Sequence, residues 1–402
     1  MMERIHTERI VGMKLLFLDW DSYGKEDLVD ALRSLGHEVI RVNLPMGDYL
    51  HDHEFARQFR AVVQKETPDA VFSSNYYPVV SGTLRSKNIP YISWVYDSPL
   101  ITLFSTSVNH PHNFIFIFDY LLYETLKERG VETVYYMPMA VHTKRVHALL
   151  AQAGAQKKYI HDIAFVGSLY DNKNNLYDRM VEKGLKERTR GYLEGVMESQ
   201  LLVYGKNLLE DMITEEVLAD MMDAMPYMVP HGVDISEKYV YANFFLGHKT
   251  TTLERRRLLG KLSERFDTAI YTTCDTTGMP GLHNEGPVDY YDEMPLVFAN
   301  SKINLNITLR TIQTGMPLRA VDIMGAGGFL LTNYQEDFFR HFKKGEEFDC
   351  FSSEEELMQK CEYYLSHEKE RAEIAENAKR KVSEELTMEG CLKTMLSIAV
   401  RN

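Results

Sequence analysis

Cysteine is scarce in this 402-residue sequence. The four cysteines, Cys274, Cys350, Cys361 and Cys391, are widely spaced and form no CxxC pair. This spacing argues against a disulfide framework and against a zinc site. We therefore expect a protein of the reducing cytoplasm that uses no metal cofactor.

Long hydrophobic runs are also missing. No apolar run reaches the roughly 20 residues that a helix needs to span a bilayer, so we predict no transmembrane segment. The first residues, MMERIHTERIVG, carry charges and lack the apolar stretch of a secretory signal. Strand-like sequence begins only at Met13, and we expect residues 1–12 to form a loose extension.

Positive charge is in deficit, with 45 Lys and Arg residues against 58 Asp and Glu residues and a net charge of −13. The chain therefore has no global attraction to nucleic acid or anionic lipid, and we expect no nucleic-acid partner. A local basic pocket for a phosphate group is compatible with this balance. Nothing in the sequence specifies an oligomeric state.

The composition that remains is that of a globular protein, with 45% apolar and 26% charged residues. A chain of 402 residues exceeds one ordinary hydrophobic core, which predicts two domains.

Short apolar runs alternate with helical patterns through the first third of the chain. Such runs are typical of buried parallel strands, and the alternation predicts a doubly wound α/β sheet. The runs are KLLFLD (14–19), EVIRVN (38–43), DAVFSS (69–74), PYISWVYD (90–97), FIFIFD (114–119) and ETVYYMP (132–138). We assign residues 13–155 to an N-terminal Rossmann-like domain.

A second alternation of strands and helices follows. Its apolar runs are DIAFVGS (162–168), TAIYTT (268–273), KINLNIT (302–308) and GFLLTN (328–333). The Met- and Leu-rich stretch at about 175–265 has a helical pattern and predicts a helical insertion. We assign residues 156–385 to a second Rossmann-like domain and expect the last helix, 386–402, to pack back on the first domain.

The carboxyl ends of strands in open α/β sheets carry ligand sites. Two such sheets facing each other would form one deep cleft. The loop DWDSYGKED (19–27) follows the first predicted strand, and its Gly24 allows close backbone approach while Asp21 and Ser22 offer polar groups. Asp21 or Ser22 as a simple helix cap is an equally good interpretation. No GxGxxG dinucleotide fingerprint is present.

The motif SWVYDSP (93–99) places Asp97 at the end of another strand. A carboxylate there can accept a proton from an acceptor hydroxyl, and Trp94 and Tyr96 are aromatic side chains suited to sugar faces. The alternative is an Asp that stabilises a turn. Asp119 follows the next strand and is a second candidate base.

The loop VGSLYDNKNN (166–175) follows the first strand of the second domain. Gly167 and Ser168 can present backbone N–H groups to a phosphate, and Lys173 supplies a positive charge. An ordinary strand-to-helix turn is the alternative.

The most informative stretch is NLNITLRTIQTGMPLRAVDIMGAGGFLLTN (304–333). Arg310 lies in a polar loop after a buried strand, and Arg319 lies near the start of a helix whose first turn contains Pro317. Both arginines are candidates to bind a diphosphate, and Asp322 is a candidate to bind ribose hydroxyls. The alternative is a structural Arg319–Asp322 pair on a solvated helix face.

These residues carry a family resemblance. LRAVDIMGAGGFLLTNYQEDF and EEFDCFSSEEELMQKCEYYLSHEKERAEIA resemble the C-terminal domain of the CgeB-like spore maturation glycosyltransferases. LFLDWDSYGKEDLVDALRSLGHEV and IPYISWVYDSPL resemble the domain that precedes it in many such bacterial proteins. The resemblance covers nearly the whole chain and is weakest at about 175–265.

The resemblance implies a metal-independent GT-B fold, with two Rossmann-like domains facing across a cleft and a nucleotide-diphosphate sugar held mostly by the C-terminal domain. By this analogy Asp322 corresponds to the second Glu of an E-x7-E motif, the ribose ligand. The position of the first Glu is occupied by Thr314. Because of this difference, the resemblance gives weaker support to a retaining mechanism in this protein. The stretch GPVDYYDEMPLVFANSKINLN (286–306) resembles the GT-B segment whose backbone, near Val288, faces the base.

We therefore expect a hexosyltransferase-like enzyme that moves a sugar to a hydroxyl acceptor, with a nucleotide-sugar co-substrate and protein cations in place of a metal. Asp97 is the expected base of an inverting reaction, and in a retaining reaction it would orient the acceptor. A sugar-nucleotide epimerase, a non-catalytic nucleotide-sugar binding module and a spore-coat interaction protein are alternatives. The sequence specifies neither the sugar, the base nor the acceptor.

Overall fold

A computed structural model of the chain describes residues 12–154, 161–171 and 175–401. The chain divides into two compact units. Unit 1 comprises residues up to Phe118, Tyr123–His142 and the segment from Leu386 onward. Unit 2 comprises Asp119–Leu122 and Thr143–Glu385.

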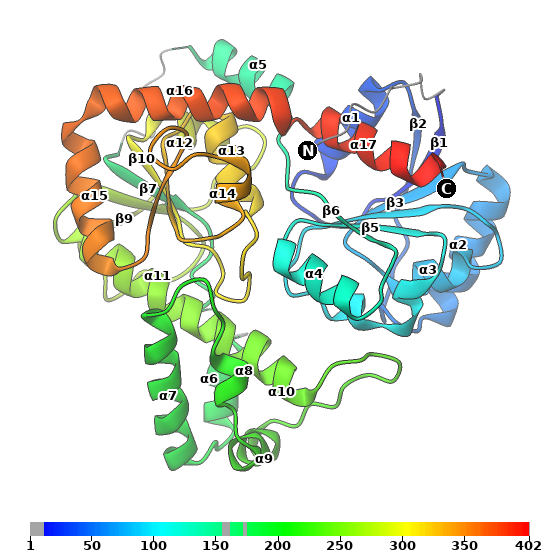
Figure 1. Ribbon diagram of the computed structural model, residues 1–402, viewed down its shortest axis with the longest axis horizontal. Helices are drawn as coiled ribbons and strands as arrows, with labels where there is room; N and C mark the ends of the chain where they lie inside the picture. The colour runs from blue at the N-terminus through cyan, green and yellow to red at the C-terminus, as the bar shows by residue number, and fades with distance from the viewer. Residues whose placement is uncertain (1–11, 155–160, 172–174, 402) are drawn as a thin grey trace. The chain divides into compact units, whose positions relative to one another are not determined.

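Unit 1 contains a six-stranded parallel sheet with the order β2-β1-β3-β4-β5-β6 (Figure 1). Its strands are β1 (Lys14–Leu18), β2 (Glu38–Val42), β3 (Ala70–Ser74), β4 (Tyr91–Val95), β5 (Asn113–Ile117) and β6 (Val134–Tyr136). Every residue of β3, β4 and β5 is buried, as expected for central strands with helices on both faces.

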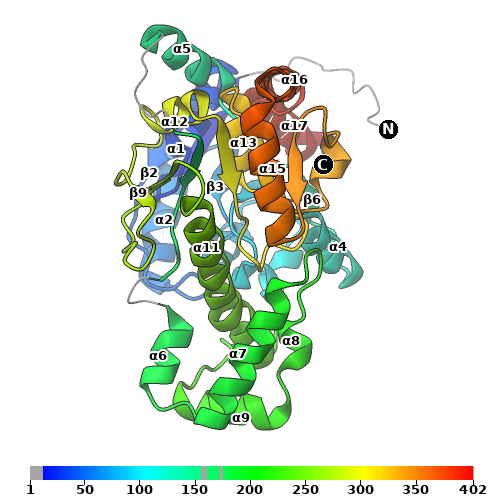
Figure 2. The same cartoon turned by 90° about the vertical axis from the view of Figure 1, so that its left-hand side faces the viewer.

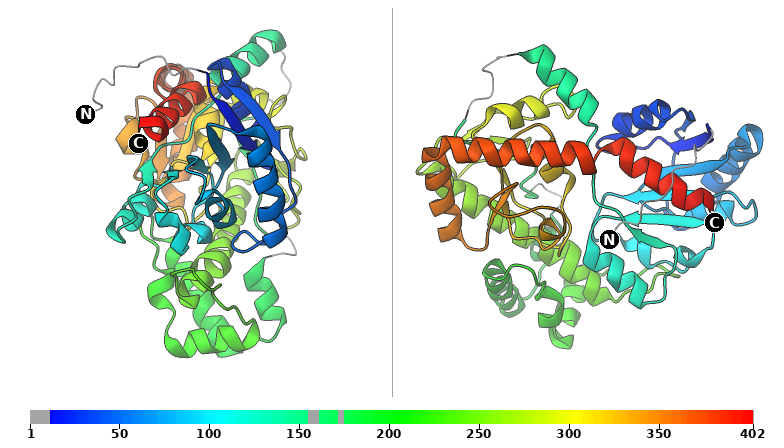
Figure 3. Two further views of the ribbon diagram at one scale, coloured as in Figure 1. Left: turned by 90° about the vertical axis from the view of Figure 1, so that its right-hand side faces the viewer. Right: turned by 45° about the horizontal axis from the view of Figure 1, so that its top comes forward.

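The helices of unit 1 are α1 (Lys25–Ser34), α2 (His53–Glu66), α3 (Pro78–Leu84), most of α4 (Tyr120–Glu128) and α17 (Met388–Arg401), with the short helices η1 (Ile101–Phe104) and η2 (Thr106–Asn109). The C-terminal helix α17 packs against α1 and against strands β4 and β5 (Figure 3). Apolar side chains of α17, including Leu392, Met395 and Leu396, are fully buried, so the end of the chain completes the core of unit 1.

Unit 2 contains a second six-stranded parallel sheet, with the order β12-β11-β10-β7-β8-β9. Its strands are β7 (Ile163–Val166), β8 (Thr268–Tyr271), β9 (Leu282–Asn284), β10 (Ile303–Asn306), β11 (Leu330–Asn333) and β12 (Asp349–Phe351). The prediction of two doubly wound α/β domains is confirmed. The sequence patterns had predicted ten of these twelve strands; β9 and β12, of three residues each, were missed.

The helices of unit 2 are α5 (Thr143–Ala153), α6 (Leu176–Glu182), α7 (Glu187–Leu201), α8 (Leu209–Met212), α9 (Glu215–Ala224), α10 (Glu237–Val240), the π-helix η3 (Tyr241–Gly247), α11 (His248–Ser263), α12 (Met294–Asn300), α13 (Leu318–Gly325), α14 (Phe338–His341), α15 (Glu354–Ser366) and α16 (Glu368–Glu385). Figure 2 shows α6, α7, α8 and α9 gathered at one end of the long helix α11. The predicted helical insertion is therefore present, and α11 connects it to the sheet. Among the described residues, no helix combines the length and apolar character required to cross a membrane.

Candidate functional site

The strand order of the parallel sheet in unit 2 reverses between β7 and β10. From β7 the chain continues to β8 on one side, and β10 then begins the other half of the sheet. Ligands of open α/β sheets bind at the carboxyl ends of the strands at such a switch point. Gly167 and Ser168 follow β7, and the loop 307–317 follows β10, so two of the sequence-predicted loops meet here.

Arg319 lies against Gly167 at this switch point. A Cβ atom at Gly167 would be 2.5 Å from Nη2 and 2.9 Å from Cζ of Arg319. The backbone of Gly167 has φ +150°, a conformation that favours glycine. Arg319 also lies over the Phe165 ring, with Cζ 5.3 Å from the centroid, and its Nη1 is 3.5 Å from Oδ1 of Asn306 at the end of β10. Gly167 and Arg319 thus come together as candidate donor-binding residues.

A second arginine, Arg255 of α11, forms hydrogen bonds to both loops. Its Nη1 donates a hydrogen bond to the carbonyl of Ser168, and its Nε and Nη2 donate to the carbonyl of Ile307. Burial lowers the pKa of the Arg255 guanidinium to about 10, and the nearby positive charge of Arg319 adds to this effect. An anion bound at the switch point would offset the repulsion between these two charges.

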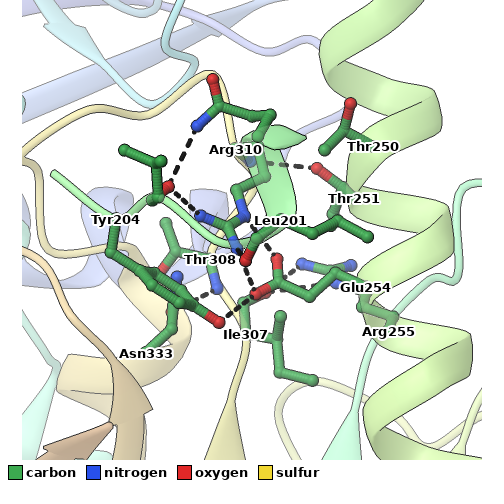
Figure 4. Close-up of polar contacts among 12 residues, drawn as sticks. Leu201, Tyr204, Thr250, Thr251, Glu254, Arg255, Ile307, Thr308, Arg310 and Asn333 are labelled. Atoms are coloured by element: carbon green, nitrogen blue, oxygen red, sulfur yellow. Dashed lines mark hydrogen bonds and ion pairs between the residues drawn. The ribbon is translucent and has the colours of Figure 1, made fainter. Parts of the chain in front are cut away.

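Arg310 does not have the role expected from the sequence. Its guanidinium is buried, forms an ion pair with Glu254 (Nε–Oε2 2.7 Å) and lies 3.9 Å from the centroid of the Tyr204 ring. Nη1 and Nη2 also donate to the carbonyls of Val203 and Leu201 (Figure 4). Because every guanidinium nitrogen already donates to a protein oxygen, Arg310 fastens the helical insertion to the sheet and is not a candidate phosphate ligand.

The other predicted donor residues have different environments. Asp322 is buried on α13 and receives a long hydrogen bond, 3.4 Å, from the hydroxyl of Tyr290. Val288 is half-buried in the loop between β9 and α12, close in sequence to Tyr290. Ser168 accepts a hydrogen bond from the backbone N–H of Tyr170. Lys173 lies outside the described residues.

In unit 1, Asp97 follows β4 and is exposed. The Nδ2 atom of Asn75 donates a 2.8 Å hydrogen bond to Oδ2 of Asp97, and Oδ1 of Asn75 accepts from the backbone N–H groups of Tyr96 and Asp97. Desolvation by surrounding protein atoms raises the pKa of the Asp97 carboxyl group, and the bond from Asn75 opposes that rise. A carboxylate that is held in place with a raised pKa is suited to accept a proton.

The aromatic side chains near Asp97 are not equivalent. Trp94 is completely buried because it lies in β4, a central strand covered on both faces. The prediction that Trp94 lines a binding surface is therefore wrong. Tyr96 is half-buried and its ring packs edge-on against Trp94 with centroids 5.7 Å apart. It remains a candidate beside Asp97.

The loop after β1 provides a weaker site. Asp21 is fully exposed and pairs with Lys25 at 3.3 Å. Gly24 is the N-cap of α1 with φ 73°, and no side chain caps this helix, so neither Asp21 nor Ser22 has the capping role considered as the alternative. The hydroxyl of Ser22 is 3.4 Å from that of Ser74 at the end of β3, where unit 1 has its own switch point between β1 and β3.

Asp119 is not positioned as a catalytic base. Its carboxylate is buried and accepts hydrogen bonds from the backbone N–H groups of Gln313 and Thr314 and from Oγ1 of Thr314 (2.8 Å). Burial raises the pKa of the neighbouring Asp337 carboxyl group to about 7, and the charge of Asp119 contributes to that rise. Asp337 in turn accepts from the backbone N–H of Tyr120. These contacts give Asp119 a structural role.

Three residues of these networks were missed at the sequence level. Arg255 belongs to the run ERRRLL, which has the appearance of a solvated helix face, so no sequence signal separates it from its neighbours. Glu254 was missed for the same reason. Asn75 follows a buried strand, as Asp97 does, and the same criterion would have found it. Among the described residues, no group of three or more His, Cys, Asp or Glu side chains is arranged to hold a metal ion.

The structure is similar along nearly its whole length to solved GT-B glycosyltransferases. A glycosyltransferase from Rickettsia africae is 11% identical with a TM-score of 0.52, covering 97% of this chain and 98% of the other. Sucrose-phosphate synthase from Thermosynechococcus elongatus is 10% identical with a TM-score of 0.54, covering 96% and 98%. The Anabaena protein HepE in complex with UDP-glucose is 11% identical with a TM-score of 0.51, covering 97% and 100%.

These similarities establish the fold of the chain as GT-B. At the level of sequence, no curated protein is similar enough to be matched with it. Residues 251–397, a segment that includes Arg255, Arg319 and Asp322, match the family of glycosyl transferase-like proteins.

Proposed function

We propose that this protein is a glycosyltransferase that moves a sugar from a nucleotide-diphosphate sugar to a hydroxyl acceptor. The observation that carries the proposal is the contact between Gly167 and Arg319 at the β7–β10 switch point. This is the position at which sheets of this order bind phosphorylated ligands, and Arg319 lies in the segment that matches the glycosyl transferase-like family.

The diphosphate of the donor is proposed to bind at Arg319, with the buried charge of Arg255 behind it. A planar guanidinium can bind phosphate oxygens through two parallel hydrogen bonds. Asp322, on the same helix as Arg319, is proposed to accept hydrogen bonds from the ribose hydroxyls. Lys173 remains a prediction from the sequence, and the backbone near Val288 is proposed to face the base.

The reaction is proposed to proceed without a metal. Negative charge develops on the diphosphate as it leaves, and preorganised positive groups stabilise that charge in the transition state. The one DxD sequence, Asp19-Trp20-Asp21, follows β1 in unit 1, and its two carboxylates form ion pairs with Lys25 and Arg41. In this proposal the arginines at the switch point of unit 2 supply the compensating charge.

On the acceptor side, Asp97 is proposed to accept the hydroxyl proton if the reaction inverts the configuration of the sugar. Its attachment to Asn75 supports this role, because a positioned base must keep its orientation. If the reaction retains the configuration, Asp97 is proposed to orient the acceptor. All four cysteines are free, which supports the proposed cytoplasmic location.

The test begins with nucleotide-diphosphate hexoses, starting with UDP-glucose because a protein of similar fold was solved with it. Binding is measured by thermal shift, and release of nucleoside diphosphate is then followed with a panel of saccharide acceptors. The proposal predicts acceptor-dependent release. Conversion of the donor to an epimer without acceptor, or binding of none of the nucleotide sugars, would contradict it.

A further inference from the structure

Three aromatic side chains meet at the carboxyl ends of the strands of unit 1. Trp20 follows β1, Tyr49 lies in the loop after β2, and Tyr77 lies in the loop after β3. The rings of Trp20 and Tyr77 meet edge to face with centroids 4.5 Å apart, and those of Tyr49 and Tyr77 do so at 5.4 Å. We call these three residues the aromatic cluster of unit 1.

The aromatic cluster keeps part of its surface open. Tyr49 is 56% exposed, and Trp20 and Tyr77 are half-buried. By contrast, the stacked rings of Phe17 and Phe72 inside the same sheet are completely buried. Exposed apolar surface that gathers in one place marks an interaction site, and ligands of open α/β sheets bind at the carboxyl ends of the strands.

The rings are held in place before any ligand arrives. Nε1 of Trp20 donates a 2.9 Å hydrogen bond to the carbonyl of Leu44, and the carbonyl of Tyr49 accepts a 3.1 Å bond from the backbone N–H of Val79. The loop after β2 is thereby attached to the residues after β1 and to α3. Trp and Tyr side chains that are already fixed lose little entropy when a ligand packs on them.

The aromatic cluster lies beside Asp97. Asn75, two residues before Tyr77, donates the 2.8 Å hydrogen bond to Oδ2 of Asp97. Burial raises the pKa of the Tyr77 hydroxyl, and the neighbouring Tyr49 and Asp97 add to that rise. The hydroxyl groups of Tyr49 and Tyr77 make no hydrogen bond to the described residues. Each can therefore donate to a ligand or accept from it.

The charged side chains next to the aromatic cluster are engaged with one another. Asp19, which precedes Trp20, pairs with Arg41 at 2.9 Å and with Lys25 at 3.7 Å, and Arg41 also pairs with Glu26 at 2.7 Å. The groups left for a ligand are aromatic rings and phenol hydroxyls. A saccharide matches both, because its C–H face packs on aromatic rings and its hydroxyl groups donate and accept hydrogen bonds.

We propose that the aromatic cluster of unit 1 binds a saccharide, with Trp20 and Tyr49 packed on its ring and Tyr77 hydrogen-bonded to one of its hydroxyl groups. The role of this saccharide as the acceptor, with a hydroxyl presented to Asp97, rests on the proposed function. The binding of the saccharide itself does not. The acceptor hydroxyl of the proposed reaction is then that of a sugar.

Tryptophan fluorescence reports on this site. The chain has two tryptophans, Trp20 and Trp94, and Trp94 is completely buried. A saccharide at the aromatic cluster therefore protects Trp20 from quenching by acrylamide and leaves Trp94 unaffected. The probes are glucose, galactose, mannose, N-acetylglucosamine, maltose and cellobiose, each titrated with and without UDP. At least one probe is expected to give saturable protection, and Trp20→Phe is expected to remove that signal.

Two mild variants test the contacts. Tyr49→Ala removes an exposed ring, and Tyr77→Phe keeps its ring and removes only the hydroxyl. Each is expected to weaken saccharide binding roughly 3- to 10-fold, the effect of a lost aromatic contact or hydrogen bond. Tyr363→Ala, which removes a 42% exposed tyrosine of α15 in unit 2, is the matched control and should bind as wild type does. Unchanged affinity in both variants, or saturable binding of none of the probes, overturns the proposal.

Turnover separates this proposal from the proposed function. With a nucleotide sugar as donor, Tyr49→Ala is expected to raise the KM of the saccharide acceptor and to leave donor affinity unchanged. Saccharide binding at the aromatic cluster without transfer from any nucleotide sugar would contradict the proposed function and keep the binding site. Transfer to a saccharide with the KM of wild type in both Tyr49→Ala and Tyr77→Phe would overturn the binding site although the proposed function stands.

Discussion

Arg319 occupies the space that a side chain on residue 167 would need, because a Cβ at Gly167 would be 2.5 Å from its Nη2 atom. The glycine that follows β7 and the arginine at the start of α13 are 152 positions apart in the sequence, counting from 167 to 319, and form one local arrangement. This contact places a guanidinium at the switch point of the sheet, where the diphosphate of the donor is proposed to bind.

Gly167→Ala tests this arrangement. The new methyl group is expected to displace Arg319 and to lower nucleotide-sugar affinity at least 10-fold, with a stability loss of about 1–3 kcal/mol from the strained backbone and the clash. Gly184→Ala is the control, because Gly184 also has positive φ (101°) but nothing within 4 Å of its would-be Cβ. Urea unfolding and calorimetric titration are measured on both. Equal donor affinity in the two variants would show that Arg319 does not depend on Gly167.

Arg310→Ala is expected to destabilise the protein by about 3–5 kcal/mol, because Glu254 would remain buried without its partner. The double variant Arg310→Met/Glu254→Gln should recover a large part of this loss, since no uncompensated charge is left. Urea unfolding provides the free energies for this cycle. A folded, normally stable Arg310→Ala protein that no longer binds nucleotide sugar would instead make Arg310 a donor ligand.

Asp337 is expected to make stability depend on pH. Its pKa is raised to about 7 by burial, above the ordinary value of 3.8, so the folded state holds a proton that the unfolded state has lost. Its contribution to stability is therefore complete below about pH 4 and declines as the pH rises toward 7. The decline amounts to a few kcal/mol at most, since one pKa unit corresponds to about 1.4 kcal/mol.

Asp337→Asn should remove this decline, because the amide does not titrate. The free energy of unfolding measured from pH 4 to pH 8 for both proteins tests this expectation. Parallel curves for wild type and variant would assign the pH dependence to other groups.

Asp97→Asn is expected to lower kcat by about 10²- to 10⁴-fold in an inverting reaction while donor affinity stays near that of wild type. Asn75→Gly offers a finer test, because it removes the hydrogen bond that lowers the pKa of Asp97 and keeps the positive φ of residue 75. The acid limb of the kcat profile should then move to higher pH. Near-normal turnover in Asp97→Asn would exclude Asp97 as the base.

Much of the fold could be predicted from the sequence, because buried parallel strands have a strong pattern. Runs such as FIFIF and KINLN have no other simple interpretation, whereas β9 and β12 have only three residues each and too few apolar positions to form a pattern. The helical insertion was also predicted from its composition.

The site could be predicted only in part. Position after a strand correctly selected Gly167 and Asp97 as residues at strand ends, but it does not reveal which partners a side chain meets. Arg310 and Arg319 look alike in the sequence, and Glu254, 56 residues before Arg310, decides that Arg310 is structural. Trp94 lies inside β4 and is buried, whereas Tyr96 lies just beyond the last residue of β4 and is half-buried. The sequence does not mark where this strand ends, so it could not separate the two aromatic residues.

Calorimetric titration of wild type and Arg319→Ala with the same donor tests whether a nucleotide-diphosphate sugar binds at Arg319. Arg380→Ala, which removes an exposed arginine of α16, is the matched control. Loss of a charged hydrogen bond predicts a decrease in affinity of about 1.5–3 kcal/mol in Arg319→Ala alone, with unfolding unchanged. Equal affinity of a folded Arg319→Ala protein and wild type would show that the donor does not bind at Arg319.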